Sequence, residues 1–332
     1  MKKAIYIIAL ISLISFNTRS QGIHFSQYYE APLLLNPGNS GTIKTDIRAN
    51  VLYRNQWASV GNSYKTMYAS FDAPILKNDY DKKTTGIGLS FFSDKAGKSN
   101  YGRTEVNLSA SQSVHINDYS EISAGLVFTY GQISANFNGL KWDNQYDGTK
   151  YIESLPTGEG NLNTSSSYFD VGAGVVWKYY GDRNNESNAG ISILNATQTW
   201  KATLAKNSSS DKRNFRIILH GKTEIPLSQD YNNFIIPSIF ISQQAGSREI
   251  SLGTLYKTEV GLNSNYTGYF TSSYLYAGMI YRFQDALVAI IKYEWQKRIQ
   301  LGVSYDINAS KLKTASNYQG GFEISLTWKG EF

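Results

Sequence analysis

Two runs near the C-terminus alternate strictly between apolar and polar side chains, and this periodicity constrains the fold more than any other feature. The runs cover residues 298–306 and 321–328. Their apolar members are Ile299, Leu301, Val303 and Tyr305 in the first run, and Phe322, Ile324, Leu326 and Trp328 in the second. Because successive side chains of a strand point to opposite faces, each run is predicted to be a strand with one apolar and one polar face. Such strands occur in soluble β-sandwiches and in outer-membrane β-barrels, where the apolar face contacts lipid and the polar face lines the lumen.

The composition favours the barrel. The chain has 332 residues, enough for two ordinary domains or one large barrel, with 25 Tyr and 28 Gly. Abundant aromatic residues suit the girdles of a membrane barrel, and the C-terminal Phe332 agrees, because such barrels commonly end on an aromatic residue. A mean hydropathy of -0.35 excludes a polytopic helical membrane protein. It does not exclude a barrel, whose inward half is polar.

Residues 1–20 have the features of a secretory signal peptide. Lys2 and Lys3 precede an apolar run over residues 4–16, and small residues at 18 and 20 allow cleavage before Gln21. The apolar run is too short to span a membrane comfortably. The absence of Cys excludes disulfides, a lipoprotein anchor and a thiol nucleophile. We therefore expect export to the cell envelope.

The net charge gives no sign of a nucleic-acid partner. It is +6 for the whole chain, and Lys2, Lys3 and Arg19 of the signal contribute three of these charges. The other charges are scattered singly along predicted polar strand faces, whereas a nucleic-acid-binding protein clusters its Lys and Arg.

An irregular segment is predicted to precede a barrel of fourteen strands. Residues 21–45 show no periodicity, and Pro32 and Pro37 argue against a helix or a central strand there, so this segment is expected to pack inside or under a barrel formed by residues 46–332. An even strand number suits a bacterial outer-membrane barrel. The predicted strands are residues 46–56, 66–72, 85–94, 103–113, 119–134, 166–178, 186–196, 214–225, 233–243, 247–262, 272–283, 286–294, 298–306 and 319–329.

The predicted long connections lie on one side of this barrel. Residues 135–165, 197–213 and 307–318 follow the fifth, seventh and thirteenth predicted strands. Connections after odd-numbered strands all leave the same end of an up-and-down barrel, and outer-membrane barrels have their long loops outside the cell. A sandwich has no reason to sort its loops in this way.

The barrel also gives the strand charges a location. A lipid-facing charge at mid-bilayer costs about 2–4 kcal/mol, so charged strand residues are expected to face the lumen. These residues are Arg216, Lys222, Glu224, Arg282, Lys292, Glu294, Arg298 and Glu323. Four tryptophans near strand ends are interpreted as interface girdles, with ligand stacking as the alternative: Trp57, Trp177, Trp295 and Trp328.

No catalytic or metal-binding pattern is present in the sequence. His24, His115 and His220 lie far apart without metal-ligand spacing, and each is interpreted as structural. Residues 96–99 mimic only the end of a phosphate-binding loop, and residues 143–148 lack the closing Glu of a calcium loop. We expect no catalytic residue, no metal and no cofactor, and no enzyme activity.

Four sequence blocks carry a family resemblance. In chain order they are His24-Phe25-Ser26-Gln27-Tyr28 with Asn36-Pro37, then Tyr53-Arg54-Asn55-Gln56-Trp57, then Tyr305-Asp306-Ile307-Asn308 with Ser310-Lys311-Leu312, and finally Gly320-Gly321-Phe322-Glu323-Ile324-Ser325-Leu326. Together they resemble the PorP/SprF family of the type IX secretion system and its associated gliding machinery. One departure is Gly38, where that family usually has Ala after Asn-Pro.

The resemblance implies an integral outer-membrane barrel that exports, or holds at the cell surface, a protein with a type IX C-terminal signal, such as a large adhesin. It implies partners in that signal domain, in other secretion components including periplasmic ones, and in the lipid bilayer. It brings no catalytic residues. The motif residues either tie the N-terminal segment into the barrel or contact a client, and they are His24, Phe25, Ser26, Gln27, Tyr28, Asn36, Pro37, Arg54, Asn55, Gln56, Trp57, Gly321, Phe322 and Glu323.

Two other functions stay open at this point. The first is an outer-membrane channel or transporter for a small or apolar solute, which would share the strand number and the N-terminal segment. The second is an outer-membrane hydrolase, although the sequence nominates no Ser or His for it.

Overall fold

The computed structural model describes residues 25–57, 63–78, 82–137, 140–158, 164–181, 185–198, 213–228, 232–261, 272–310, 314 and 316–331. The predicted signal peptide, residues 1–20, and the motif residue His24 lie outside these ranges.

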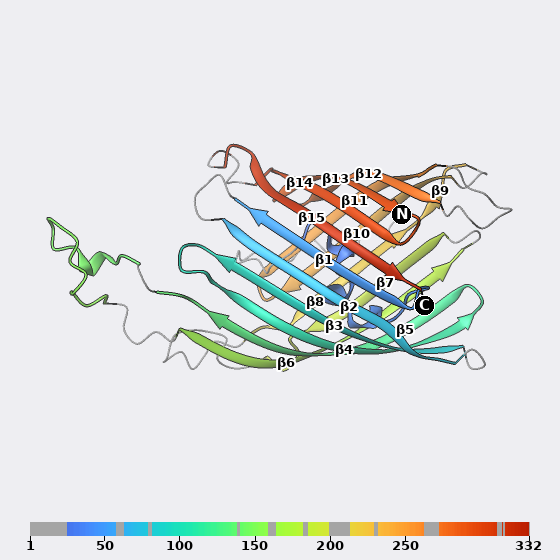
Figure 1. Ribbon diagram of the computed structural model, residues 1–332, viewed down its shortest axis with the longest axis horizontal. Helices are drawn as coiled ribbons and strands as arrows, with labels where there is room; N and C mark the ends of the chain where they lie inside the picture. Colours follow the sequence, from blue (N-terminus) through green and yellow to red (C-terminus); the bar gives the residue numbers. More distant parts are fainter. Residues whose placement is uncertain are drawn as a thin grey trace, which may run out of the picture.

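The described strands form one antiparallel sheet that closes into a barrel (Figure 1). The last strand pairs with the first, from Ile47 opposite Gly330 to Gln56 opposite Gly321. In chain order the strands are β1 (Ile47–Gln56), β2 (Tyr64–Asn78), β3 (Lys83–Ala96), β4 (Tyr101–Asn117), β5 (Ser120–Ser134), β6 (Ser165–Tyr180), β7 (Glu186–Leu194), β8 (Arg216–Thr223), β9 (Ile225–Pro226), β10 (Asn233–Gln244), β11 (Ser247–Val260), β12 (Ser273–Arg282), β13 (Ala286–Trp295), β14 (Ile299–Asn308) and β15 (Gln319–Gly330). This all-β closed barrel confirms the predicted fold.

The eighth predicted strand, residues 214–225, is divided in the structure. Both β8 and β9 pair with β10, so they share one position and the described barrel has fourteen strands, as predicted. The division falls at Glu224, opposite the stretch of β10 that contains Pro237. Proline has no N–H to donate to a neighbouring strand, which explains a local loss of pairing there.

The two ends of the barrel differ. The connections 135–164, 195–215 and 309–318 leave the same end, which we call the long-loop end. The connection 261–272 lies at the opposite end and is also long, so loop length is sorted less completely than the sequence indicates. The strands β2 to β6 have 14 to 17 residues and form the taller side of the wall.

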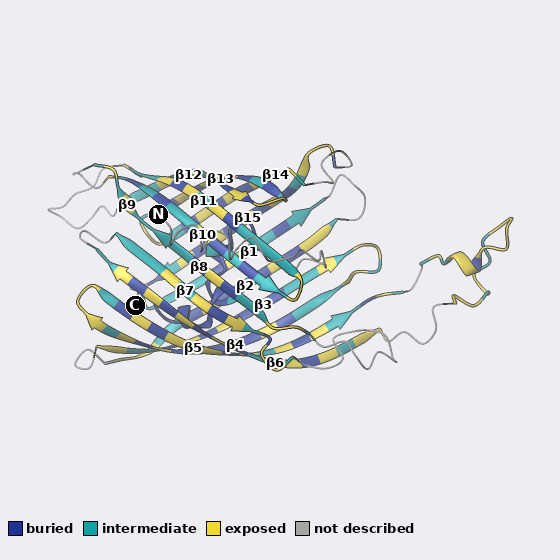
Figure 2. Ribbon diagram, turned by 180° about the vertical axis from the view of Figure 1, so that it is seen from behind, coloured by how far each residue is buried: buried dark blue, intermediate teal, exposed yellow. Residues whose placement is uncertain are grey.

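Burial alternates along the strands, as Figure 2 shows by its bands of dark blue and yellow. The outward side chains are mostly large and apolar; Ile324 and Leu326 of β15, for example, are exposed, whereas the alternating residues Glu323 and Ser325 are buried. Because the exposed apolar side chains surround the barrel, the outer face suits the hydrocarbon of a bilayer.

The lumen is less polar than the predicted pattern suggests. Leu52, Tyr68 and Phe92 point inward from β1, β2 and β3 and form an apolar cluster with Phe25 and Ala31 of the N-terminal segment. A second luminal cluster gathers apolar residues of β8 and β10 to β13 around Tyr28 and Leu35. An empty lumen would favour polar side chains at these positions, but a filled lumen packs like a protein core.

The prediction that Arg298 faces the lumen is wrong. Arg298 is exposed in the turn between β13 and β14, because β14 begins one residue later, at Ile299. Of the four tryptophans, Trp177, Trp295 and Trp328 are exposed on the outer face toward the end opposite the long loops. Trp57 ends β1 with a φ of 57° and packs edge-on against Tyr64.

The N-terminal segment holds three single-turn helices, η1 (Tyr28–Glu30), α2 (Pro32–Leu35) and η2 (Pro37–Asn39). Pro32 and Pro37 were expected to argue against a helix, and each instead begins a single turn, because the first helical residue needs no N–H partner inside the helix. No helix of the described residues has the length and apolar character needed to cross a membrane.

The outward facing of β15 gives a direct test of the barrel. Replacing Ile324 by Arg should cost about 2–4 kcal/mol, because the charge would face the bilayer near the middle of the strand. We expect the Ile324→Arg protein to be depleted from the outer membrane, measured by immunoblotting of membrane fractions, whereas Ile324→Val should accumulate normally. Equal amounts of the two variants would contradict the assigned facing.

Candidate functional site

Residues 25–42 lie within the barrel, and we call them the luminal segment. Ser26 contacts β1, β12, β14 and β15 close to the long-loop end, whereas Gly41 and Thr42 contact β2 and β6 closer to the opposite end. The segment therefore follows the length of the lumen before the chain turns back into β1. Figure 1 shows it as the dark blue coils enclosed by the strands.

A buried carboxylate holds the start of this segment. Glu323 on β15 accepts hydrogen bonds from the backbone N–H of Ser26, at 2.6 Å, and of Gln27, at 3.0 Å. Its side chain is fully buried. Hydrogen bonds from N–H groups to a carboxylate are charge-assisted and about twice as strong as neutral ones, so these two bonds fix the position of the backbone at this end.

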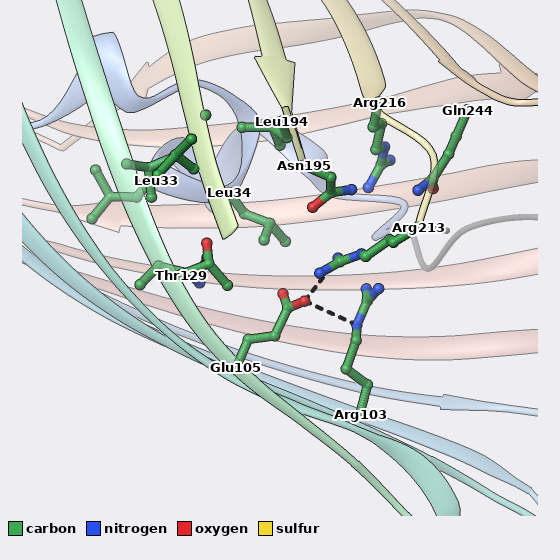
Figure 3. A pocket seen from close by; sticks show the side chains of 14 residues that line it. Leu33, Leu34, Arg103, Glu105, Thr129, Leu194, Asn195, Arg213, Arg216 and Gln244 are labelled. Atoms are coloured by element: carbon green, nitrogen blue, oxygen red, sulfur yellow. Dashed lines mark hydrogen bonds and ion pairs between the residues drawn. The ribbon is translucent and has the colours of Figure 1, made fainter. Parts of the chain in front are cut away.

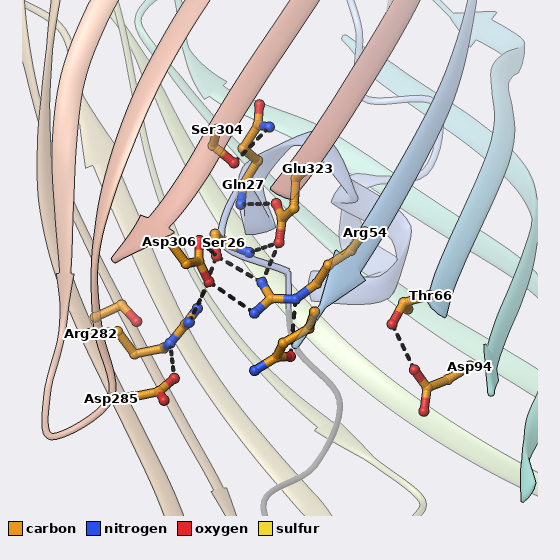
Figure 4. Close-up of polar contacts among 12 residues, drawn as sticks. Ser26, Gln27, Arg54, Thr66, Asp94, Arg282, Asp285, Ser304, Asp306 and Glu323 are labelled. Carbon is orange, nitrogen blue, oxygen red and sulfur yellow. Dashed lines mark hydrogen bonds and ion pairs between the residues drawn. The ribbon is translucent and has the colours of Figure 1, made fainter. Parts of the chain in front are cut away.

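Arg54 of β1 completes the cluster (Figure 4). Its guanidinium pairs with Glu323, and its Nη2 lies 2.9 Å from Asp306 Oδ2 on β14. Arg282 of β12 contacts the same Asp306 oxygen at 2.7 Å and pairs with Asp285. The Ser26 hydroxyl donates to Asp306 at 2.7 Å and accepts from Arg54 at 2.8 Å. We call Ser26, Arg54, Arg282, Asp306 and Glu323 the anchor cluster.

Two further polar side chains of the luminal segment are held by the wall. Gln27 donates to Ser304 at 3.1 Å and accepts from Ser325 at 2.9 Å. Glu30 contacts Lys292 at 3.0 Å, and it also accepts from Gln300 and Thr327. Lys292 therefore balances the charge of the buried Glu30.

Asn36 and Pro37 fix the middle of the segment against the opposite wall. Asn36 Nδ2 donates to the carbonyl oxygens of Val175 and Ile191, both at 3.0 Å. Asn36 Oδ1 accepts from the N–H of Gly38, which closes the turn that starts η2. One amide side chain thus connects the segment to β6 and β7.

Inward-facing glycines make room for the luminal segment. A Cβ on Gly174 would lie 2.1 Å from Asn36 Oδ1, and one on Gly125 would lie 2.5 Å from the carbonyl of Pro37. The same holds for Gly86 against Ser40 and for Gly302 against Gln27. Because these glycines lie on β3, β5, β6 and β14, the wall matches the segment around much of the barrel.

Charged contacts also close the end opposite the long loops. Asp72 of β2 accepts from the N–H of Gly41 at 2.8 Å and pairs with Arg48 at 2.9 Å. Lys178 of β6 donates to the carbonyl oxygen of Thr42. These bonds fix the C-terminal part of the luminal segment, ahead of β1.

A small cavity remains on the side away from the anchor cluster (Figure 3). It has a volume of about 40 Å³ and is lined by Arg103, Glu105, Arg213 and Arg216 of the wall and by Leu33 and Leu34 of α2. Next to it lies an apolar cavity of about 20 Å³, lined by Leu34 and Phe240 among others. Neither cavity of the described residues has room for a continuous aqueous path.

The structure brings most of the predicted motif residues together. Ser26, Gln27, Arg54 and Glu323 meet in or beside the anchor cluster, and Gln56 accepts from Arg54 at 3.3 Å. Phe25 and Tyr28 enter the two luminal apolar clusters. Gly321 pairs with Gln56 at the seam.

Other predicted motif residues lie apart from this cluster, among them Asn36 and Pro37 at the opposite wall. Asn55 points away from the lumen at the long-loop end of β1, Phe322 is exposed on the outer face, and Trp57 sits at the rim. Of the histidines, His220 faces the lumen, 3.4 Å from Asn36, and His115 stacks on Tyr180. No group of three or more potential metal-ligating side chains occurs in the described ranges.

Sequence reasoning missed several luminal contacts. It placed Arg282 and Lys292 in the lumen but not against Ser26 and Glu30, and it assigned no role to Glu30 or Asp72. The signal available was an acid inside an aperiodic apolar stretch, which requires a buried cation to pair with it.

The fold and this site define an outer-membrane β-barrel whose lumen is filled by its own N-terminal segment. The chain belongs to the family described as type IX secretion system membrane protein PorP/SprF, which matches residues 17–328. It is therefore an outer-membrane component of the type IX secretion system, and this membership implies contact with other secretion components.

Solved structures of other barrels resemble the chain at low identity. A Pseudomonas aeruginosa FadL homologue matches with 11% identity and a TM-score of 0.47, over 89% of this chain and 92% of that one. The CymD monoaromatic hydrocarbon channel matches with 10% identity and a TM-score of 0.46, over 94% of this chain and 95% of that one. BamA from Haemophilus ducreyi lacking POTRA domains 1-3 matches with 10% identity and a TM-score of 0.41, over 86% of this chain and 71% of that one. No curated protein sequence matches the chain.

The anchor cluster predicts a strong effect of one neutral substitution. Glu323→Gln keeps the shape of the side chain but leaves Arg54 without one of its two carboxylates. Breaking a buried ion pair from one side costs about 3–5 kcal/mol. We expect a loss of this size in the free energy of unfolding in urea, followed by Trp fluorescence of the protein in detergent.

The matched control is Asp118→Asn, which removes one charge from the exposed pair with Lys82. This variant should unfold at the urea concentration of the wild-type protein, because exposed pairs contribute little. Equal effects of the two substitutions would contradict the anchoring role of Glu323.

Proposed function

We propose that this barrel supports export, cell-surface attachment, or both, of a protein with a type IX C-terminal signal, such as a large adhesin. It does so without catalysis and without a cofactor. The chain reaches the outer membrane by way of the signal peptide predicted over residues 1–20. Family membership supports the secretion role, and the luminal segment supports the way in which the barrel performs it.

The filled lumen is the observation that carries this proposal. The luminal segment is bound to β1, β2, β6, β7 and β12 to β15 through buried polar contacts. A folded or extended client has no path through such a lumen. The client therefore crosses the membrane through another component and meets this barrel at its surface.

The long-loop end offers the surface for such a client. Within the connection between β5 and β6, Gln145 is buried and donates to the carbonyl oxygens of Glu153 and Leu155 at 3.2 and 3.1 Å. Lys141 lies over the ring of Tyr151 at 4.9 Å. These contacts order part of a long connection at the end that is predicted to be outside the cell, as a protein-binding loop requires. The opposite end then faces the periplasmic secretion components.

Co-purification tests the proposed client. The affinity-tagged protein, extracted in mild detergent from cells that express it, should retain a protein whose C-terminal domain carries a type IX signal, identified by mass spectrometry. Deletion of residues 140–158 should reduce that recovery at least tenfold while leaving the barrel folded, as judged by its heat-modifiable migration in gels. Recovery of neither a signal-bearing protein nor a secretion component would overturn the proposal.

A channel for a small or apolar solute is the rival function, and conductance separates the two. In planar bilayers the wild-type protein should be closed, because the luminal segment occupies the pore. Removal of residues 26–40 should open a stable conductance, since the glycine-lined wall would then enclose water. An open wild-type channel would favour the transporter.

A further inference from the structure

Hydrogen-bond donors outnumber acceptors around the cavity of about 40 Å³ described above. Arg103 of β4, Arg216 of β8 and Arg213 of the connection that leads into β8 contribute guanidinium groups, and Figure 3 shows them converging on one space. The acidic side chain among the lining residues is Glu105. Each guanidinium carries five N–H donors and no acceptor.

One oxygen atom, Oε1 of Glu105, contacts two of these guanidinium groups. Glu105 Oε1 accepts from Arg213 Nη2 at 2.8 Å and from the Tyr168 hydroxyl at 2.6 Å, and it lies 3.2 Å from Arg103 Nε. Arg213 is about nine-tenths buried, with a side-chain exposure of 10%. Its Nη1 has no hydrogen-bond partner among the described residues, and Asp170 Oδ2 is 3.9 Å away. A buried charged donor without a partner is costly, so this nitrogen marks a place for an acceptor.

The cavity lies near the long-loop end. Arg103 is two residues from the start of β4, Arg216 begins β8, and Gln244 ends β10, all at the long-loop end. Leu33 and Leu34 of the luminal segment form an apolar floor below the guanidinium groups. Arg216 also interacts with the charge of Glu249, so selectivity for an anion rests mainly on Arg103 and Arg213.

We propose that this cavity binds the C-terminal carboxylate of a peptide that enters from the long-loop end, with an apolar last side chain directed to the leucine floor. A carboxylate oxygen would accept from Arg213 Nη1, while Nη2 keeps its bond to Glu105, and the volume admits about one carboxylate. The proposal rests on the proposed function, because it assigns the client a contact inside the mouth of the barrel. Asp170 competes with the ligand for Arg213.

The test uses two small probes that differ only in charge. N-acetyl-leucine carries the carboxylate, and N-acetyl-leucinamide replaces it with a neutral amide. Isothermal titration of the wild-type protein in detergent should show N-acetyl-leucine binding at least tenfold more tightly than the amide. Acetate, which lacks the apolar part, should bind at least tenfold more weakly than N-acetyl-leucine.

Variants assign the binding to the cavity. Arg213→Gln should weaken N-acetyl-leucine at least tenfold, and Asp170→Asn should tighten it several-fold by releasing Arg213. Lys82→Gln, at the end opposite the long loops, is the control and should bind like the wild type. If Arg213→Gln does not fold, as judged by heat-modifiable migration, the binding of N-acetyl-leucine is measured with Arg103→Gln, which should also weaken it.

Three results would overturn the inference: equal binding of acid and amide, equal binding of acetate and N-acetyl-leucine, or unchanged binding in both arginine variants. Failure of the proposed function looks different, because no signal-bearing protein would then co-purify with the wild-type barrel whatever the probes do. If a client co-purifies equally with the wild type and Arg213→Gln, the function stands and the client contact in this cavity is refuted.

Discussion

The structure depends on one buried ion cluster, in which Arg54 lies between Glu323 and Asp306. Three desolvated charges are stable only if every donor and acceptor among them is matched. The luminal segment completes these hydrogen bonds. The backbone N–H groups of Ser26 and Gln27 donate to Glu323, and the Ser26 hydroxyl donates to Asp306 and accepts from Arg54. Because Arg54 and Glu323 face each other across the pairing of β1 with β15, the same cluster joins the first strand to the last and holds the luminal segment.

The filling of the lumen follows from this anchor. Once the segment is fixed near the long-loop end, its short helical turns pack on apolar side chains of the wall, and glycines such as Gly125 and Gly174 admit Pro37 and Asn36. The two cavities described above, of about 40 and 20 Å³, border this segment at Leu34.

The fold could be predicted from the sequence because a period of two decides the facing of each strand residue without knowledge of its neighbours. The same pattern placed Glu323 on the inner face, where the structure sets it opposite Arg54. It could not find their partners, since the N–H groups of Ser26 and Gln27 have no signature in the sequence. Glu30 was missed for a related reason: it lies in an aperiodic segment, and its contacts with Lys292 and Gln300 span more than 260 residues. The strand pattern could not locate strand ends such as Ile299, because these depend on turn geometry. For this reason it placed Arg298 in the lumen, although Arg298 lies in a turn.

The central claim is that the luminal segment occupies the barrel, and a disulfide tests it most directly. The chain has no Cys, and Ser40 Oγ of the segment lies 2.7 Å from Ser109 Oγ of β4. The Ser40→Cys, Ser109→Cys double variant should form a bond in isolated outer membranes, so that both thiols resist alkylation until reduced. A control pairing Ser40→Cys with Ser167→Cys, on the outer face of β6, should stay reactive. Free thiols in both proteins would contradict a filled lumen.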